Sequence, residues 1–527
     1  MKWLLAMAVA CRLAGVFVVT VGAGCAMSHS LDHRVEAVTA EKAAAVVPCS
    51  SNAVADVFHA TPANRPVAPE LQLGLTNALR LATVYSRQLQ GNRDSLYLNG
   101  LKAITVRRQF GPQYSGTLAY VLTRQAGSEN DSAASGSLKV SQILPTGGSL
   151  SVGASESRDQ TESGTNGALY SGSADIELRQ PLLAGAGYEA SHNGLIQAER
   201  DLIYGLRTFI LNRQDFCLTV IRQYYDLLIM KSVVDNTRAN MEQSTFLRKR
   251  SEALFKIRQV TAVDVMRAQQ QELSAQNSLL ETETALDIAT KRFLILLSIP
   301  VEIRVVLTGS IPEQRRSHAK ERVSIDIALE RRLDLATAKE QLEDASRRLH
   351  IARNSLLPRA DVYFAAGSSG SSDSLIGGDR ANVVSGGVEL DIPLDKRESK
   401  EAVKRAEREE AAANRAVTET IDNIKVAISK SISELVALER TVDIEDKNNE
   451  LAGRRLDHTM LRFKSGELSN RDVVEAQSEL LAARNARVRA IVNYEIQRLQ
   501  LLRDSGLLDV AVDGELLELP LPETAGR

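Results

Sequence analysis

Residues 255–277 read FKIRQVTAVDVMRAQQQELSAQN, and residues 463–485 read FKSGELSNRDVVEAQSELLAARN. The two stretches align at an offset of 208 without a gap, and nine of their positions are identical. Unrelated segments of this length would share about one or two positions. The identical pairs are Phe255/Phe463, Lys256/Lys464, Asp264/Asp472, Val265/Val473, Ala268/Ala476, Gln269/Gln477, Leu273/Leu481, Ala275/Ala483 and Asn277/Asn485. The chain therefore contains an internal duplication.

The sequence around each copy repeats as well. Each half opens with a predicted amphipathic helix, and a proline then ends the helical pattern. Alternating segments follow, a second proline closes them, and a very long helical stretch begins. The first helices are predicted at Leu75–Arg107 and Ile325–Ser355, and the prolines are Pro112, Pro181, Pro358 and Pro393.

The long stretches 190–256 and 395–463 are nearly free of proline and glycine. At ~1.5 Å per residue each would extend about 90–100 Å, which is wider than a small domain. Such helices are expected to pack side by side in a coiled-coil-like tube. The pattern is interrupted at 257–262 and 465–470 and resumes at 263–297 and 471–504. Each half therefore predicts a helical hairpin whose tip is the repeated motif.

The segments between the prolines, 113–180 and 360–392, have a period of two. Leu118, Tyr120 and Leu122 alternate with smaller or polar residues, and Gly/Ser/Asp/Asn-rich stretches separate the runs. This pattern is typical of a membrane β-barrel, and a soluble antiparallel sheet is the alternative. Two to six strands per chain cannot close a barrel, and open edges in lipid leave backbone groups unsatisfied. Several copies are therefore expected to share one barrel.

The N-terminus predicts export. Residues 1–24 resemble a signal peptide. Their apolar run is too short to span a bilayer as a helix. Translation from Met7 instead of Met1 would place Arg12 in the basic segment with which signal peptides usually begin. Ala-Gly-Cys at the end of the signal peptide resembles a bacterial lipobox, which predicts lipid attachment at Cys25; ordinary signal cleavage nearby is the alternative. Residues 25–69 then form a predicted tether. A disulfide between Cys49 and Cys217 is compatible with an oxidising compartment, but no spacing motif favours it.

Composition argues against several other classes of protein. The 64 basic and 66 acidic residues nearly balance, so nothing points to a nucleic-acid partner. The sequence has no CxxC pair, no histidine cluster with metal spacing, no Walker loop and no nucleophile elbow. We therefore expect no enzyme activity, no metal and no cofactor.

Several motifs occur in a characteristic order along the chain: Leu178–Leu183 with Gly185 and Gly187, the counterparts Leu357-Pro358 and Leu390–Leu394, and the tip motif Arg462–Asn485. Together they resemble the TolC-like outer-membrane factor (outer membrane efflux protein) family. Arg462–Asn485 is similar to the family's hairpin tip, and Leu178–Leu183 is similar to its turn from barrel to helix. The resemblance covers about residues 70–505.

The resemblance implies a mainly α protein with a membrane β-barrel portion, assembled as a homotrimer. The shared barrel would cross the bacterial outer membrane, in contact with its lipid, and long helical hairpins would form a periplasmic tunnel. The implied function is an exit duct of a tripartite efflux or type I secretion system, through which solutes leave passively. Its implied partners are a periplasmic adaptor (membrane fusion) protein and an inner-membrane pump or ABC transporter. A non-pore periplasmic coiled-coil lipoprotein is the alternative.

This interpretation divides the chain into a first structural repeat at 70–300, an equatorial linker at 301–324, a second repeat at 325–505 and a tail at 506–527. The two prolines that bound the alternating segments are 69 positions apart in the first half and 35 positions apart in the second. Leu144–Gly148 within the longer span predicts a tight turn between two extra strand segments. Each chain then gives either six membrane strands or the family's usual four with a folded-over hairpin, and we favour four.

Acidic residues near the tips are the candidate pore constriction. Asp264 and Asp472 start the returning helices, where a carboxylate can simply offset the helix dipole. In the family, acidic residues near this point narrow the periplasmic mouth, and Glu475 shares a helix face with Asp472. The candidates are therefore Asp472, Glu475 and Asp264, with Arg267 placed to pair with a carboxylate across the gate.

The second tip is the candidate adaptor contact. We expect it to be exposed, and it consists of Phe463, Lys464, Ser465, Gly466, Glu467 and Leu468. Arg258 stands in the first tip where the second has Gly466. Because glycine adopts a left-handed turn more cheaply than arginine does, the two tips are expected to differ in shape.

Overall fold

The computed structural model describes residues 71–123, 131–161, 169–311, 321–372, 380–465, 467–468, 470–511 and 516–519. The predicted signal peptide, the tether, Cys25, Cys49 and Gly466 lie outside the described residues.

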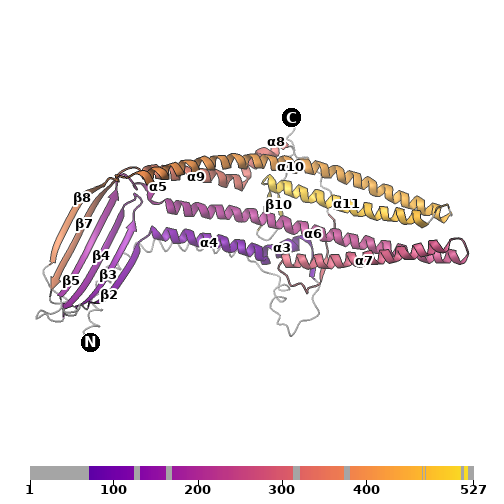
Figure 1. Cartoon of the computed structure of the whole chain (residues 1–527), viewed down its shortest axis with the longest axis horizontal. Coiled ribbons are helices and arrows are strands. Elements are labelled where there is room, and N and C mark those ends of the chain that lie inside the picture. The colour runs from indigo at the N-terminus through magenta and orange to yellow at the C-terminus, as the bar shows by residue number, and fades with distance from the viewer. Residues whose placement is uncertain are drawn as a thin grey trace.

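The molecule is elongated, with a β-sheet at one end and two helical hairpins reaching to the other (Figure 1). The helices are α3 (Leu75–Tyr85), α4 (Arg87–Gln109), α5 (Tyr188–Ser191), α6 (Asn193–Lys256), α7 (Ala262–Leu296), α8 (Glu321–Arg331), α9 (Leu333–Asn354), α10 (Arg397–Lys464) and α11 (Asn470–Asp504). The strands are β1 (Leu71–Leu73), β2 (Gln113–Thr123), β3 (Asp131–Ile143), β4 (Ser149–Thr161), β5 (Leu169–Pro181), β6 (Val305–Leu307), β7 (Arg359–Ser372), β8 (Arg380–Asp391), β9 (Leu508–Val510) and β10 (Leu516–Glu518).

The large sheet contains six strands in the order β2-β3-β4-β5-β7-β8, and all neighbours are antiparallel. The preference for four strands is therefore wrong. The predicted turn at Leu144–Gly148 is present, but the hairpin that it closes stays in the plane of the sheet. β3 pairs with β2 and β4 pairs with β5, so each strand of the hairpin continues the ladder on its own side.

The first predicted helix of each half is broken into two. Ser86 separates α3 from α4 with ψ 125°, and Arg332 separates α8 from α9 with ψ 124°, both extended conformations. Neither position is a proline or a glycine, so neither break could be predicted from a local helix-breaking residue. Arg332 is held by Asp334 at 2.6 Å between Nη2 and Oδ2, and by the carbonyl of Asp504. The breaks let α3 and α8 leave the line of the long helices near the middle of the molecule (Figure 1).

The main core lies at this equator. Tyr224 and Phe293 pack there with Leu297, all at most 1% exposed. The small parallel pair β1–β6 and part of the predicted tail, β9–β10, close over it. Arg498 fixes β10 through Glu518, with 2.8 Å between Nη1 and Oε2. Cys217 is a buried free thiol in this core, and burial raises its pKa to about 12.

Long-range ion pairs join the two halves between the equator and the sheet. Asp344 of α9 is 1% exposed and accepts hydrogen bonds or ion pairs from Arg347, Arg200 and Tyr204 at 2.8, 3.0 and 2.7 Å. Arg200 and Tyr204 belong to α6, so this cluster connects the first half to the second. Buried charges of this kind are tolerated when each has an oppositely charged or hydrogen-bonding partner within the cluster, as Asp344 has here.

Candidate functional site

Both hairpin tips end their outgoing helix with the same backbone bond. The amide of Gln259 donates to the carbonyl of Leu254 at 2.9 Å, and the amide of Glu467 donates to that of Arg462 at 3.0 Å. These are equivalent positions at the offset of 208, and the bond is that of a Schellman cap. Arg258 adopts φ +64° to make it. The sequence difference at this position therefore does not change the closing bond, although arginine holds a left-handed conformation at a cost of about 1–2 kcal/mol.

Asp264 caps α7. Its carboxylate accepts hydrogen bonds from the hydroxyl and the amide of Thr261 at 2.7 and 3.1 Å, while its own amide donates to the Thr261 hydroxyl. These bonds lower the pKa of Asp264 below its ordinary value of 3.8. Arg267 lies 3.7 Å away on the same helix, so its ionic partner in the chain is Asp264.

Glu475 and Asp472 lie at the start of α11 in the second hairpin. Asp472 is partly buried in the first turn, and Glu475 is exposed. Arg455 of α10 binds Glu475 with 3.3 Å between Nη2 and Oε1, and its other guanidinium nitrogen binds Glu479. One arginine therefore offsets part of the negative charge of this face, a partner that sequence reasoning missed because it comes from another helix.

The predicted adaptor-contact residues do not share one environment. Ser465 and Glu467 are exposed and Leu468 is partly buried, as expected of a turn; the side chain of Lys464 and the whole of Gly466 lie outside the described residues. Phe463 is only 9% exposed, so its expected exposure is wrong.

Phe463 is covered by a neighbouring helix. It packs with Leu247 of α6 and Val473 of α11, and the guanidinium carbon of Arg250 lies 4.7 Å from its ring centroid. Phe255, at the equivalent position of the first tip, is 46% exposed. The difference arises because α6 lies against the second hairpin, a tertiary contact that the repeat does not encode. This cluster holds the two hairpins together near their tips.

A second polar cluster lies where the sheet meets the helices. Arg179 of β5 reaches Glu389 of β8 at 2.8 Å and Asp361 of β7 at 3.3 Å, and Arg359 reaches Asp361 at 2.9 Å. These residues could have been recognised in the sequence, because they are charged residues at odd-numbered positions of strands whose even-numbered positions are apolar. The cluster joins three strands from both halves at the rim of the sheet.

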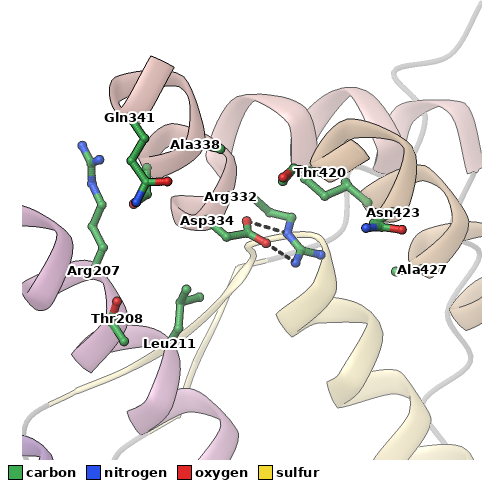
Figure 2. Close-up of a pocket in the computed structure, with 12 residues that line it drawn as sticks. Arg207, Thr208, Leu211, Arg332, Asp334, Ala338, Gln341, Thr420, Asn423 and Ala427 are labelled. Carbon is green, nitrogen blue, oxygen red and sulfur yellow. Dashed lines mark hydrogen bonds and ion pairs between the residues drawn. The ribbon is translucent and has the colours of Figure 1, made fainter. Parts of the chain in front are cut away.

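An open depression lies between α6, α9 and α10, where Arg332 and Asp334 form an ion pair (Figure 2). Arg207, Thr208 and Gln341 are among the residues that line it, so it offers polar contacts.

Within the described ranges, no set of three or more His, Cys, Asp or Glu side chains is placed to hold a metal ion. No helix in the described part of the chain combines the length and apolar character needed to cross a membrane.

Residues 324–506 match the family model of the outer membrane efflux protein. The chain is also similar to the alkaline protease secretion protein AprF of Pseudomonas aeruginosa, with 23% identity over 346 residues, which is 64% of this chain and 70% of the relative.

Among solved structures, the fold is similar to the CmeC outer membrane channel of Campylobacter jejuni, with a TM-score of 0.62 at 13% identity over 82% of this chain and 85% of that one. It is also similar to the outer membrane protein VceC of Vibrio cholerae, with a TM-score of 0.61 at 14% identity over 82% of this chain and 96% of that one.

Proposed function

We propose that the chain is a member of the outer membrane efflux protein family and that three copies form an exit duct in the outer membrane. The sheet of each copy contributes to one barrel, and the helices form a tunnel that reaches into the periplasm. Solutes delivered at the periplasmic tip then pass outward without any chemical step.

The large sheet carries this proposal. Among the described residues, β2 and β8 each pair with a strand on one side only. Unpaired backbone groups in lipid cost several kcal/mol each, so both edges need a partner. Because the number of strands is even, β8 of one copy runs antiparallel to β2 of the next, and a ring of copies closes without a mismatch.

The faces of the sheet support a membrane position. One row of paired residues crosses all six strands with apolar side chains, and the adjacent row on the opposite face is mainly polar. The first row is Tyr114, Val140, Val152, Ile176, Ala366 and Val384; the second is Gln113, Ser141, Ser151, Glu177, Ala365 and Ser385. Apolar side chains would face lipid and polar ones the lumen.

We place the constriction at the helical tip. Asp472 and Glu475 of three copies would surround the mouth of the tunnel, and Asp264 would contribute from the first hairpin. Such a ring favours cations over anions. Arg455 reduces the negative charge of this ring by forming an ion pair with Glu475.

The exposed second turn, with Ser465, Glu467 and Leu468, would contact a periplasmic adaptor, and an inner-membrane pump or ABC transporter would supply the cargo. Multidrug or toxic-compound efflux fits the general family. The similarity to an alkaline protease secretion protein specifically favours a type I secretion system as the second candidate.

Mass spectrometry of the mature chain would establish whether Cys25 carries lipid.

Planar-bilayer recording of the purified full-length protein tests the duct. We expect discrete, cation-preferring channels, and the double variant Asp472→Asn/Glu475→Gln should lose much of that preference. Asp287→Asn, which removes an exposed carboxylate far along α7, is the matched control and should leave it unchanged. Absence of channels would favour a non-pore coiled-coil lipoprotein, and an unchanged preference in the double variant would remove the constriction assignment.

A further inference from the structure

The hairpin β3–β4 is an integral part of the sheet. β3 pairs with β2 from Asp131 to Ser141, and β4 pairs with β5 from Ser149 to Asp159. A hairpin folded over the sheet would leave at least one of these ladders unmade. All six strands are 11 to 14 residues long, so each is long enough for the ~9–11 residues that a tilted membrane strand needs.

The hairpin carries the same two faces as its neighbours. Val140 and Val152 stand in the apolar row, and Leu138 is 66% exposed on that face. Ser141 and Ser151 are paired on the opposite face. The half of the hairpin next to its turn is therefore patterned for lipid on one side and water on the other, like β8. Farther from the turn, Glu156 and Arg158 stand on the face of Val152.

The turn of the hairpin is fixed to the junction between sheet and helices. The carbonyl of Thr146 accepts hydrogen bonds from the amide of Gly187 at 3.0 Å and from the side chain of Gln180 at 3.1 Å. Gly147 has φ +89°, and a Cβ there would lie 2.7 Å from the carbonyl oxygen of Gly185. Glycine is required at this close approach. The turn thus belongs to the periplasmic rim, although no helix continues from it.

Ring circumferences show why two extra strands fit. Four long helices per copy, α4, α6, α9 and α10, adjoin the sheet (Figure 1), and twelve helices at about 8–10 Å spacing make a ring of about 96–120 Å. Strands about 4.8 Å apart and tilted by about 40° give about 75 Å for twelve strands and about 110 Å for eighteen. Six strands per copy therefore match the circumference of the helical ring, whereas four would require it to narrow.

We propose that this protein forms an eighteen-stranded barrel with no narrowing between tunnel and exit, built for cargo larger than a twelve-stranded barrel passes. The backbone radius would be about 18 Å instead of about 12 Å, because barrel diameter grows nearly linearly with strand number. This inference rests on the proposed trimeric duct and adds the width of its outer part.

Single cysteines in the full-length chain test where the hairpin lies. Val140→Cys and Val152→Cys should carry a spin label that oxygen reaches from lipid, while labels at Ser141→Cys and Ser151→Cys should be reached by a water-soluble nickel chelate. Val384→Cys and Ser385→Cys on β8 provide the matched reference. Equal nickel access at all four hairpin positions, with the β8 pair still alternating, would overturn the eighteen-stranded barrel and leave the duct intact.

Polymer exclusion tests the width. Polyethylene glycols of increasing size, added on the extracellular side of bilayers, report the entrance of the barrel independently of the periplasmic tip. Deleting residues 131–161 brings β2 beside β5 in antiparallel orientation and should reduce the polymer-accessible cross-section roughly twofold. An unchanged size cut-off in a folded deletion variant would overturn the inference; if that variant does not fold, the spin-label pattern decides. Absence of any channel in the unmodified protein would instead reject the duct.

Discussion

Replacing Phe463 with alanine should favour the open tip. Phe463 packs with Leu247 and Val473 under the guanidinium of Arg250, and this cluster joins the second hairpin to α6 near the tips. Buried Phe→Ala substitutions cost about 3–5 kcal/mol, and the small size of this cluster argues for about 3. If the second hairpin swings away from α6 on opening, the closed state alone loses the contacts with Leu247 and Arg250, about half of this energy. Val473 belongs to the same hairpin as Phe463, so the loss of that contact affects both states equally. The ratio of open to closed channels should then rise roughly tenfold.

Open probability in single-channel recordings measures this effect. Phe255→Ala, at the equivalent position of the first hairpin, is the matched control: its ring is 46% exposed, so it should cost less than about 1.5 kcal/mol. Arg250→Gln removes only the cation–π contact, worth about 0.5–1 kcal/mol, and should raise opening two- to fivefold. An open probability unchanged by Phe463→Ala, in a variant whose melting confirms a weakened tip, would refute the idea that the hairpins separate here.

Three further predictions concern stability. Asp344→Asn should lower the free energy of unfolding in micelles by about 3 kcal/mol, because it leaves buried arginines without their carboxylate; no change would mean that the cluster is dispensable. Arg258→Gly should raise stability by about 0.5–1 kcal/mol, since it relieves a left-handed φ of +64° at some cost in chain entropy; a loss would show that the arginine side chain makes a stabilising contact in the assembly. The folded-state pKa of Asp264 is lowered, so its cap is fully present above pH 3.8 and is lost as pH falls through the folded value. The hydrogen-exchange protection factors of residues 261–267, which compare each rate with the intrinsic rate at the same pH, should therefore fall in acid, and Asp264→Asn should abolish this pH dependence.

The hairpins and the alternating segments could be predicted from the sequence because their signals are local. The duplicated tip, the absence of proline over about 65 residues and the period of two all act within one element. The choice between four and six strands could not be predicted in this way. Leu138 and Val140 alternate in the same manner whether β3 lies in the sheet or folds over it, and only the ladders to β2 and β5, distant in sequence, distinguish the two arrangements.

The tip residues likewise divide into those whose contacts are local in the sequence and those whose contacts come from distant helices. The cap made by Asp264 depends on Thr261, three residues earlier, and could have been recognised as a capping motif. The burial of Phe463 and the pairing of Glu475 with Arg455 depend on helices that approach from elsewhere in the chain. The breaks at Ser86 and Arg332 are likewise imposed by packing at the equator, because neither residue is a strong helix breaker.

The unbroken length of α6 makes it a mechanical lever. It runs for 64 residues, which corresponds to about 96 Å at 1.5 Å per residue. A rotation of only about 5° where it leaves the sheet would move its far end by about 8 Å, more than the reach of a long side chain. A side-chain rearrangement of ordinary size beside the membrane can thus displace the far end of α6 by several ångströms. A partner bound at that far end needs little force to tilt the whole helix.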